Sequence, residues 1–91
     1  MIPNSATLQQ ALIEVLIANP GGLSSKDIDN HVAAKLDVKK QDRDLIRSGT
    51  RTEFAYRMAW ERTHAKAKGL ISKGEKRNWK ITELGKQKRS K

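Results

Sequence analysis

The sequence predicts a mainly helical domain that ends in a small β-sheet. Its 91 residues suffice for one core. Apolar residues recur at helical spacing in three stretches, and each stretch opens on a Ser or Thr that can cap a helix. The segment LISKGEKRNWKIT then has the turn and the alternation of a hairpin. With no cysteine in the chain, neither disulfides nor thiolate metal sites can stabilise it.

The chain divides into one domain and two short ends. We expect residues 1–6 to be a flexible lead-in, residues 7–86 to form the domain and residues 87–91 to be a basic tail. The longest apolar run near the start, Ala11 to Ala18, is interrupted by Glu14 and is too short to span a bilayer. We therefore expect no membrane contact and a cytoplasmic location.

Two helices are predicted in the first half. Thr7 is expected to cap the first helix, which stops at the breaker Asn19-Pro20-Gly21-Gly22. Gly22-Leu23 then forms a brief extended piece at the sheet edge. Ser24 caps the second helix, which ends between Leu36 and Lys39. The apolar stripes of both helices predict core packing and no chemistry.

The segment Lys39 to Arg47 is dense in charge. It is predicted to be a short helix or an irregular turn. Leu45 and Ile46 are expected to anchor it to the core, and Ser48-Gly49 to form a loop before the next helix.

The stretch Thr50 to Gly69 is predicted to be the helix around which the domain is organised. Thr50 is the expected cap, with Thr52 as the alternative. Gly69 ends the helix in the left-handed conformation. At a spacing of 3.6 residues per turn, the inward positions are Phe54, Met58 and Ala65, with Glu61 at the margin.

Positive charge is concentrated in the second half of the chain. Residues 1–45 contain five Lys/Arg against six Asp/Glu, whereas residues 46–91 contain fourteen against four. This asymmetry suggests a basic face for a polyanion. The order helix, helix, short helix, long helix, basic hairpin matches a winged helix-turn-helix, in which the last helix enters the major groove of DNA.

Ten residues are candidates for contact with double-stranded DNA. The small or flanking residues of the long helix are predicted to read bases, and cations of the helix and the hairpin to hold phosphates. The candidates for base contact are Thr52, Ala55, Tyr56 and Ala59. The candidates for backbone or minor-groove contact are Arg51, Arg62, Lys66, Lys73, Lys76 and Arg77.

No catalytic residue, metal site or cofactor is predicted. Asp37-Val38-Lys39 has the acid-x-Lys spacing of some nucleases, but it has no apolar strand around it and no second acid. His31 and His64 are expected to be surface or packing residues, because no third ligand accompanies either one. Trp60 and Trp79 are expected to serve the core or its edge.

The second half resembles a known family. Phe54, Arg57, Met58, Ala59 and Trp60, then Gly69-Leu70-Ile71, then Trp79-Lys80-Ile81-Thr82 with Gly85, are similar to the N-terminal domain of Mrr-type restriction endonucleases. The resemblance covers about residues 7–86. It implies a winged helix that serves as the DNA-reading module of a modification-dependent restriction enzyme, acting on methylated DNA with a fused or partner nuclease domain. Tyr56 and Ala65 depart from the family pattern, which usually has Asn and Leu there.

Two other functions stay open on the sequence alone. A free-standing transcription regulator would share the DNA-binding step but would need dimerisation to read paired half-sites. A protein-interaction module would bind an acidic partner on the cationic face, with Tyr56 and Trp60 as anchors. The oligomeric state, the target sequence and any preferred methyl mark are left open.

Overall fold

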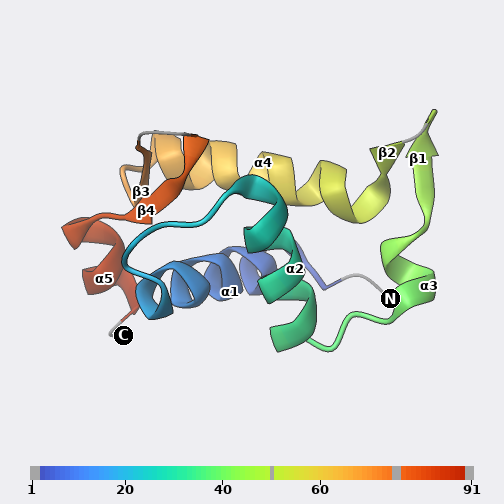
Figure 1. Cartoon of the computed structure of the whole chain (residues 1–91), viewed down its shortest axis with the longest axis horizontal. Helices are drawn as coiled ribbons and strands as arrows, with labels where there is room; N and C mark the ends of the chain where they lie inside the picture. Colours follow the sequence, from blue (N-terminus) through green and yellow to red (C-terminus); the bar gives the residue numbers. More distant parts are fainter. Residues whose placement is uncertain (1–2, 50, 75–76, 90–91) are drawn as a thin grey trace.

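In the part of the chain that the structure describes, the fold has three main helices and two β-hairpins (Figure 1). A computed structural model describes residues 3–49, 51–74 and 77–89, except for the side chains of residues 47, 48, 51, 88 and 89. The helices of this described chain are α1 (Ser5–Ala18), α2 (Ser25–Lys35), α3 (Lys40–Arg43), α4 (Glu53–Ala67) and α5 (Glu83–Arg89). Its strands are β1 (Ile46–Ser48), β2 (Arg51–Thr52), β3 (Ile71–Lys73) and β4 (Trp79–Ile81). The domain is thus mainly helical with a hairpin after the long helix, which confirms the predicted winged-helix class.

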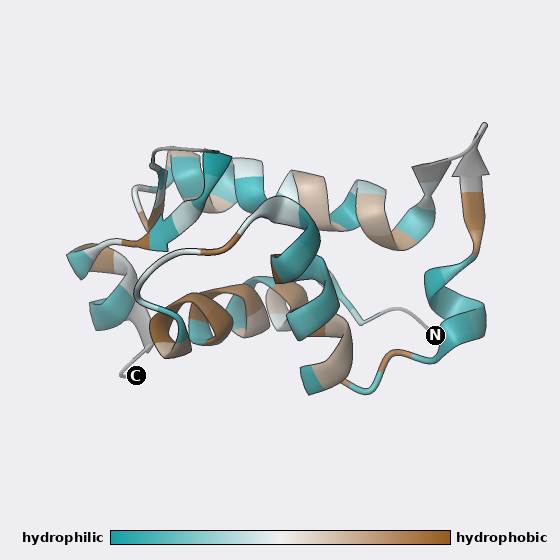
Figure 2. Ribbon diagram, viewed as in Figure 1, coloured by the Kyte–Doolittle hydropathy of each residue, from teal (hydrophilic) through white to brown (hydrophobic). Residues whose placement is uncertain are grey.

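Helix α1 is the central element of the core. It lies alongside α4 and contacts α2, α5 and β4 as well (Figure 1). Figure 2 shows strongly apolar residues along α1, whereas α3 is hydrophilic. Burying one large aliphatic side chain stabilises the fold by about 1.5–3 kcal/mol. The largest fully buried side chains are Leu8, Leu12, Leu16, Ile28, Val32, Met58 and Ile71.

Helix α1 begins earlier than predicted. Its cap is Asn4, not Thr7, and the Asn4 Oδ1 accepts a hydrogen bond from the Thr7 amide at 2.9 Å. Asn is at least as good a cap as Thr, so the helix does not need Thr7 as its cap. The helix ends at Ala18, where Asn19 donates from Nδ2 to the Val15 carbonyl at 2.8 Å.

The link from α1 to α2 forms as predicted. The Leu23 amide donates to the Trp79 carbonyl at 3.0 Å, and the Trp79 amide donates back at 2.7 Å. Leu23 therefore adds a third strand position beside β4. Ser24 caps α2 by accepting from the Asp27 amide at 3.2 Å.

Residues 40–52 differ from the prediction. The short helix α3 is present, but the Leu45 and Ile46 side chains are 53% and 60% exposed, so their predicted role as core anchors is wrong. In place of a loop, β1 and β2 form an antiparallel hairpin in which Ile46 pairs with Thr52 and Ser48 with Arg51. Strands this short carry no apolar alternation, so the sequence pattern could not reveal them.

Both ends of α4 are capped. Thr52, the alternative cap, accepts from the Ala55 amide at 3.1 Å, whereas Thr50 lies outside the described residues. At the other end Gly69 has a φ of 77°, as predicted. The Leu70 amide donates to the Ala65 carbonyl at 2.9 Å, which is the long bond of a Schellman motif.

The β3–β4 hairpin is fastened to the end of α4 through Thr82. Its hydroxyl lies 2.6 Å from the Gly69 carbonyl and 2.9 Å from the Leu70 carbonyl, and can donate to either. The same oxygen accepts from the Gly85 amide at 3.0 Å. One side chain therefore joins the end of α4 to the start of α5.

Gly85 explains why α5 packs so closely. A Cβ at this buried position would lie 2.2 Å from the Leu70 carbonyl oxygen and 2.6 Å from the Ile81 Cδ1. Only glycine permits this approach of helix to backbone. Thr82 and Gly85 in the Trp-x-Ile-Thr-x-x-Gly pattern thus have structural roles.

Candidate nucleic-acid interface

The inward face of α4 holds it to the core. Phe54, Met58 and Ala65 are buried as predicted. Glu61 was expected at the margin, but only 4% of it is exposed. Its carboxylate is satisfied by α1, because Ser5 donates from Oγ at 2.5 Å and Gln9 donates from Nε2 at 3.5 Å. The acidic side chain is therefore a buried link to α1.

The outward face of α4 carries small and aromatic side chains. Tyr56, Ala59, Trp60 and Thr63 line a shallow groove of about 320 Å³. The Thr63 hydroxyl donates to the Ala59 carbonyl of its own helix at 3.0 Å. Because this proton is already used, Thr63 has mainly its methyl group and an acceptor oxygen to offer a ligand. Tyr56 and Ala59 are thus brought together as predicted.

Thr52 and Ala55 lie at the start of the same helix and are partly exposed. The Thr52 oxygen is used as the N-cap acceptor. A hydroxyl can still donate while it accepts, so Thr52 keeps one proton for a ligand.

Arg62 is held by α2. Its Nη1 lies 2.5 Å from the Asp29 Oδ1, and the two side chains are only 12% and 16% exposed. Burial raises the pKa of Asp29 to about 6, although the charges of Arg62 and Arg43 act in the opposite direction. The ion pair therefore joins α2 to α4.

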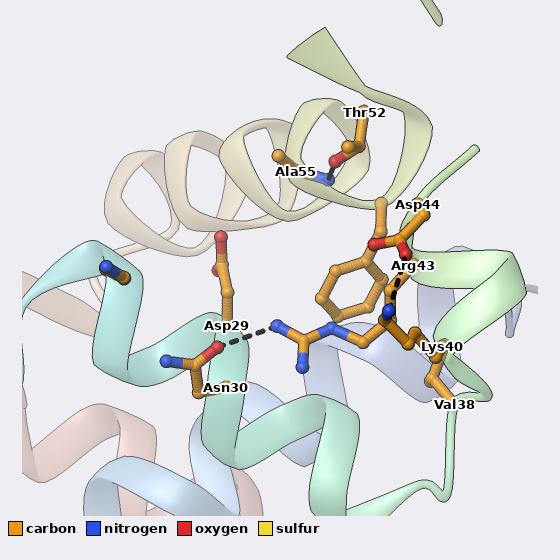
Figure 3. A pocket seen from close by; sticks show the side chains of 10 residues that line it. Asp29, Asn30, Val38, Lys40, Arg43, Asp44, Thr52 and Ala55 are labelled. Atoms are coloured by element: carbon orange, nitrogen blue, oxygen red, sulfur yellow. Dashed lines mark hydrogen bonds and ion pairs between the residues drawn. The ribbon is translucent and has the colours of Figure 1, made fainter. Parts of the chain in front are cut away.

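A cleft that the sequence did not suggest opens between α2, α3 and the start of α4 (Figure 3). It has a volume of about 710 Å³, and Thr52 and Ala55 line it, so it continues from the outward face of α4. Arg43 donates from Nη2 to the Asn30 Oδ1 at 2.7 Å and places its guanidinium 5.7 Å from the centre of the Phe54 ring. Other cations that line the cleft are Lys26 and Lys40.

A second group of cations belongs to the end of α4 and to the β3–β4 hairpin. Lys66 is exposed near the end of α4, and Arg77 is exposed beside the turn with a φ of 63°. Lys73 places its Nζ 5.2 Å from the centre of the Trp79 ring. Lys80, which the sequence did not single out, is also exposed on β4.

Two predicted contacts cannot be placed. Lys76 lies outside the described residues. For Arg51 the structure describes the backbone, as the first residue of β2, and not the side chain.

The two tryptophans have opposite environments. Trp79 is buried, as expected, and donates from Nε1 to the Ser25 Oγ at 3.0 Å. Trp60 is 48% exposed and lines a small hollow with Leu8 and Glu61, so it lies at the edge of the core, one of the two places predicted for it. It makes an edge contact with Tyr56, with ring centres 6.3 Å apart, and packs on His64 at 5.4 Å. His64 is exposed and contacts Trp60, which fits the expectation that it is a surface or packing residue.

Two absences hold for the described part of the chain. No three of its His, Asp or Glu side chains gather closely enough to hold a metal ion. None of its helices combines the length and the apolar composition that a membrane span requires.

The fold and the outward face of α4 define a winged helix-turn-helix domain. The chain belongs to the Mrr N-terminal domain family, whose model matches residues 6–91. This match confirms the resemblance seen in the sequence. Neither the curated proteins nor the solved structures gave a match.

Proposed function

We propose that this domain binds double-stranded DNA, with α4 in the major groove and the β3–β4 hairpin as a wing beside it. One observation carries the proposal. Tyr56, Ala59, Trp60 and Thr63 form a groove in the middle of α4, and exposed or partly exposed cations occur near the start of this helix and at and after its end. One set lines the cleft between α2, α3 and α4, and the other belongs to the end of α4 and to the wing. The cations are Lys26, Lys40 and Arg43 on the first side and Lys66, Lys73 and Arg77 on the second.

The two sets of cations suit the two phosphate strands that border a groove. Phosphate contacts supply most of the non-specific affinity for DNA and make that affinity depend on salt. In this proposal Lys66, Lys73 and Arg77 hold phosphates, and Arg51 and Lys76 join them as predicted from the sequence. Arg62 acts through its ion pair with Asp29, because it orients α4 against α2.

The small side chains of α4 suit close approach to the base edges. The methyl groups of Ala55 and Ala59 can contact the methyl group of thymine, and that of 5-methylcytosine in the same way. Tyr56 lines the groove next to Ala59 and is the aromatic residue among the proposed base contacts.

Membership in the Mrr N-terminal domain family supports a role in restriction. We infer that the domain is the DNA-recognition module of a restriction system and has no nuclease centre of its own. A fused or partner nuclease would supply cleavage. A cytoplasmic location would follow from this role.

A salt titration tests DNA binding. We expect the logarithm of the affinity for a labelled duplex to fall linearly with the logarithm of salt concentration. The variants Lys66→Ala and Lys73→Ala should each lower the slope by about one. The control Lys35→Ala removes a charge that pairs with Glu14 on α1 and should leave the slope nearly unchanged. Equal slopes for all the variants would contradict the proposed interface.

A competition experiment tests the methyl preference separately. Matched duplexes that are unmodified, or that carry 5-methylcytosine or N6-methyladenine, compete for the same labelled complex. A preference that disappears in Tyr56→Ala or Ala59→Gly would assign the reading of the mark to this groove. Equal competition by all the duplexes would mean that the domain does not distinguish methylated from unmodified DNA.

A second candidate function is protein docking. The exposed ring of Trp60 favours it, because aromatic residues often anchor protein interfaces. Binding of random duplex at micromolar protein and moderate salt discriminates between the two functions. No binding under these conditions would favour docking.

A further inference from the structure

We propose that the cleft between α2, α3 and the start of α4 binds a nucleotide that has left the base stack of the DNA. The inference rests on the proposed function, because the nucleotide comes from the duplex that α4 contacts. It gives a role to the segment between α2 and α4, which is longer than a helix-turn-helix requires.

The segment between α2 and α4 supplies one wall of the cleft. The turn of a helix-turn-helix has about three or four residues, whereas residues 36–52, and α3 with them, separate α2 from α4 in this chain. The helix α3 has no buried residue, so it adds little to the core. Its Lys40 and Arg43 nevertheless line the cleft, together with Val38 before the helix. The inserted segment is therefore better explained by the cleft than by stability.

Asp29 and Asn30 on α2 offer hydrogen bonds to a base. The Asp29 Oδ1 accepts from Arg62, and a carboxylate has two oxygens that can accept from further donors. Asp29 can therefore accept from the amino group of a base such as cytosine. The Asn30 Oδ1 accepts from Arg43, which leaves the Asn30 Nδ2 to donate to an acceptor of the base. The wall formed by α2 thus presents both an acceptor and a donor.

Arg43 provides a planar group on which the base can stack. Its guanidinium lies 5.7 Å from the centre of the Phe54 ring and donates to Asn30 at 2.7 Å, so two contacts hold it in place. Figure 3 shows the side chain reaching from α3 to Asn30 on α2. Nucleobases stack on guanidinium planes as well as on aromatic rings. The cleft therefore combines a stacking surface with hydrogen-bonding groups.

The volume and the charge of the cleft suit a nucleotide. Its volume of about 710 Å³ lies within the range of small-molecule sites, roughly 300–1,000 Å³. Its cations Lys26, Lys40 and Arg43 outnumber its acids Asp29 and Asp44. Lys26 and Lys40 are exposed, so they can bind the phosphates on either side of the extruded base.

The cleft lies beside the part of α4 that we place on DNA. Thr52 and Ala55, which are partly exposed at the start of α4, line it. A nucleotide that leaves the base stack next to this helix therefore reaches the cleft directly. Taking a base out of the stack costs free energy, and the cost is least for a base that is already unpaired. The domain should therefore prefer a duplex that contains an unpaired base.

A comparison of two duplexes tests the inference. Both contain one 2-aminopurine, a base whose fluorescence rises when it is unstacked, either paired with thymine or opposite an abasic site. The wild type should bind the second duplex about tenfold more tightly than the first. The fluorescence of the unpaired 2-aminopurine should rise when the protein binds.

Variants of the cleft assign this preference to its residues. Asn30→Trp fills the cleft, and Arg43→Lys keeps the charge but removes the planar group. In each variant the ratio of the two affinities should fall to about one, because the unpaired base loses its site. The control His31→Trp places the same ring at an exposed position of α2 that does not line the cleft, and should keep the ratio. Circular dichroism verifies that all the variants are folded.

The outcomes separate the two proposals. A wild type that binds neither duplex contradicts the proposed function. Equal binding of the two duplexes contradicts the nucleotide site alone, and so does a preference that Asn30→Trp and Arg43→Lys both retain. Calorimetric titration with free deoxycytidine monophosphate distinguishes the other source of a nucleotide. If this compound binds but the duplex preference is absent, the cleft is a site for free nucleotides and the inference is wrong.

Discussion

The two hairpins beside α4 are attached in opposite ways. The β3–β4 hairpin is joined to the core by buried Trp79, by the bridge to Leu23 and by the Thr82 hydroxyl. The β1–β2 hairpin is continuous with α4, but Leu45 and Ile46 in front of it and within it are exposed. Similar local structure therefore packs into the core at one end of α4, whereas at the other end it leaves two apolar side chains in solvent.

Gly85→Ala should have the largest effect on the attached hairpin. The new Cβ would overlap the Leu70 carbonyl, and the close packing of α5 leaves no room for it. We expect the free energy of unfolding to fall by about 3 kcal/mol, measured by urea denaturation. The control Gly74→Ala meets no atom closer than 3.6 Å and should have a small effect. Equal urea midpoints for both variants would show that α5 is not packed as described.

Burial of the Asp29 carboxyl should make stability depend on pH. The pKa of Asp29 is about 6 in the folded state, above its ordinary value of 3.8, so the folded state binds the proton more tightly. The contribution of Asp29 to the free energy of unfolding is therefore greatest below pH 4. It is lost as the pH rises through 6, by on the order of 2 kcal/mol. Asp29→Asn should remove this dependence.

Thermal unfolding of the wild type and Asp29→Asn at pH 4, 5, 6 and 7 measures the difference. The gain in unfolding free energy of the wild type relative to the variant should appear as the pH falls. A constant difference across this range would mean that Asp29 titrates at its ordinary pKa.

Thr82→Ala should have an intermediate effect. It removes the hydroxyl that joins the end of α4 to the start of α5, and the unfolding free energy should fall by about 1–2 kcal/mol. Thr82→Ser keeps the hydroxyl and should restore most of the loss. If the serine variant is as unstable as the alanine variant, packing of the methyl group matters more than the hydrogen bonds.

Leu45→Ser with Ile46→Ser should have the smallest effect. Both side chains are largely exposed, so the unfolding free energy should change by about 0.5 kcal/mol or less. Leu70→Ser, at a buried position beside the other hairpin, is the comparison and should be strongly destabilising. A large loss in the first variant would mean that the β1–β2 hairpin is part of the core.

The sequence predicts what the core requires. Gly69, Leu70 and the alternating pair Trp79 and Ile81 revealed the end of α4 and its wing, because a left-handed cap and a half-buried strand restrict residue type. The β1–β2 hairpin escaped prediction because its short strands leave their apolar residues in solvent. The same logic failed for Leu45 and Ile46, since an apolar residue need not be buried.

The candidate site was only partly predictable. The helical spacing of the sequence placed Tyr56 beside the outward face that holds Ala59, and both residues line one groove in the structure. Helical spacing could not predict that Arg62 pairs with Asp29, because the two residues are 33 positions apart in the sequence. Nor could it show the cleft beside Arg43, which depends on how α3 packs against α4.

Binding of a labelled duplex by Ala59→Glu tests most directly whether the outward face of α4 reads DNA. The substitution places a negative charge in the groove of α4, whereas Ala18→Glu places the same charge at the exposed end of α1. By fluorescence anisotropy, Ala59→Glu should bind at least tenfold more weakly than the wild type, and Ala18→Glu within about threefold of it. Equal affinities of the two variants, with both folded, would contradict the assignment of α4 as the recognition helix.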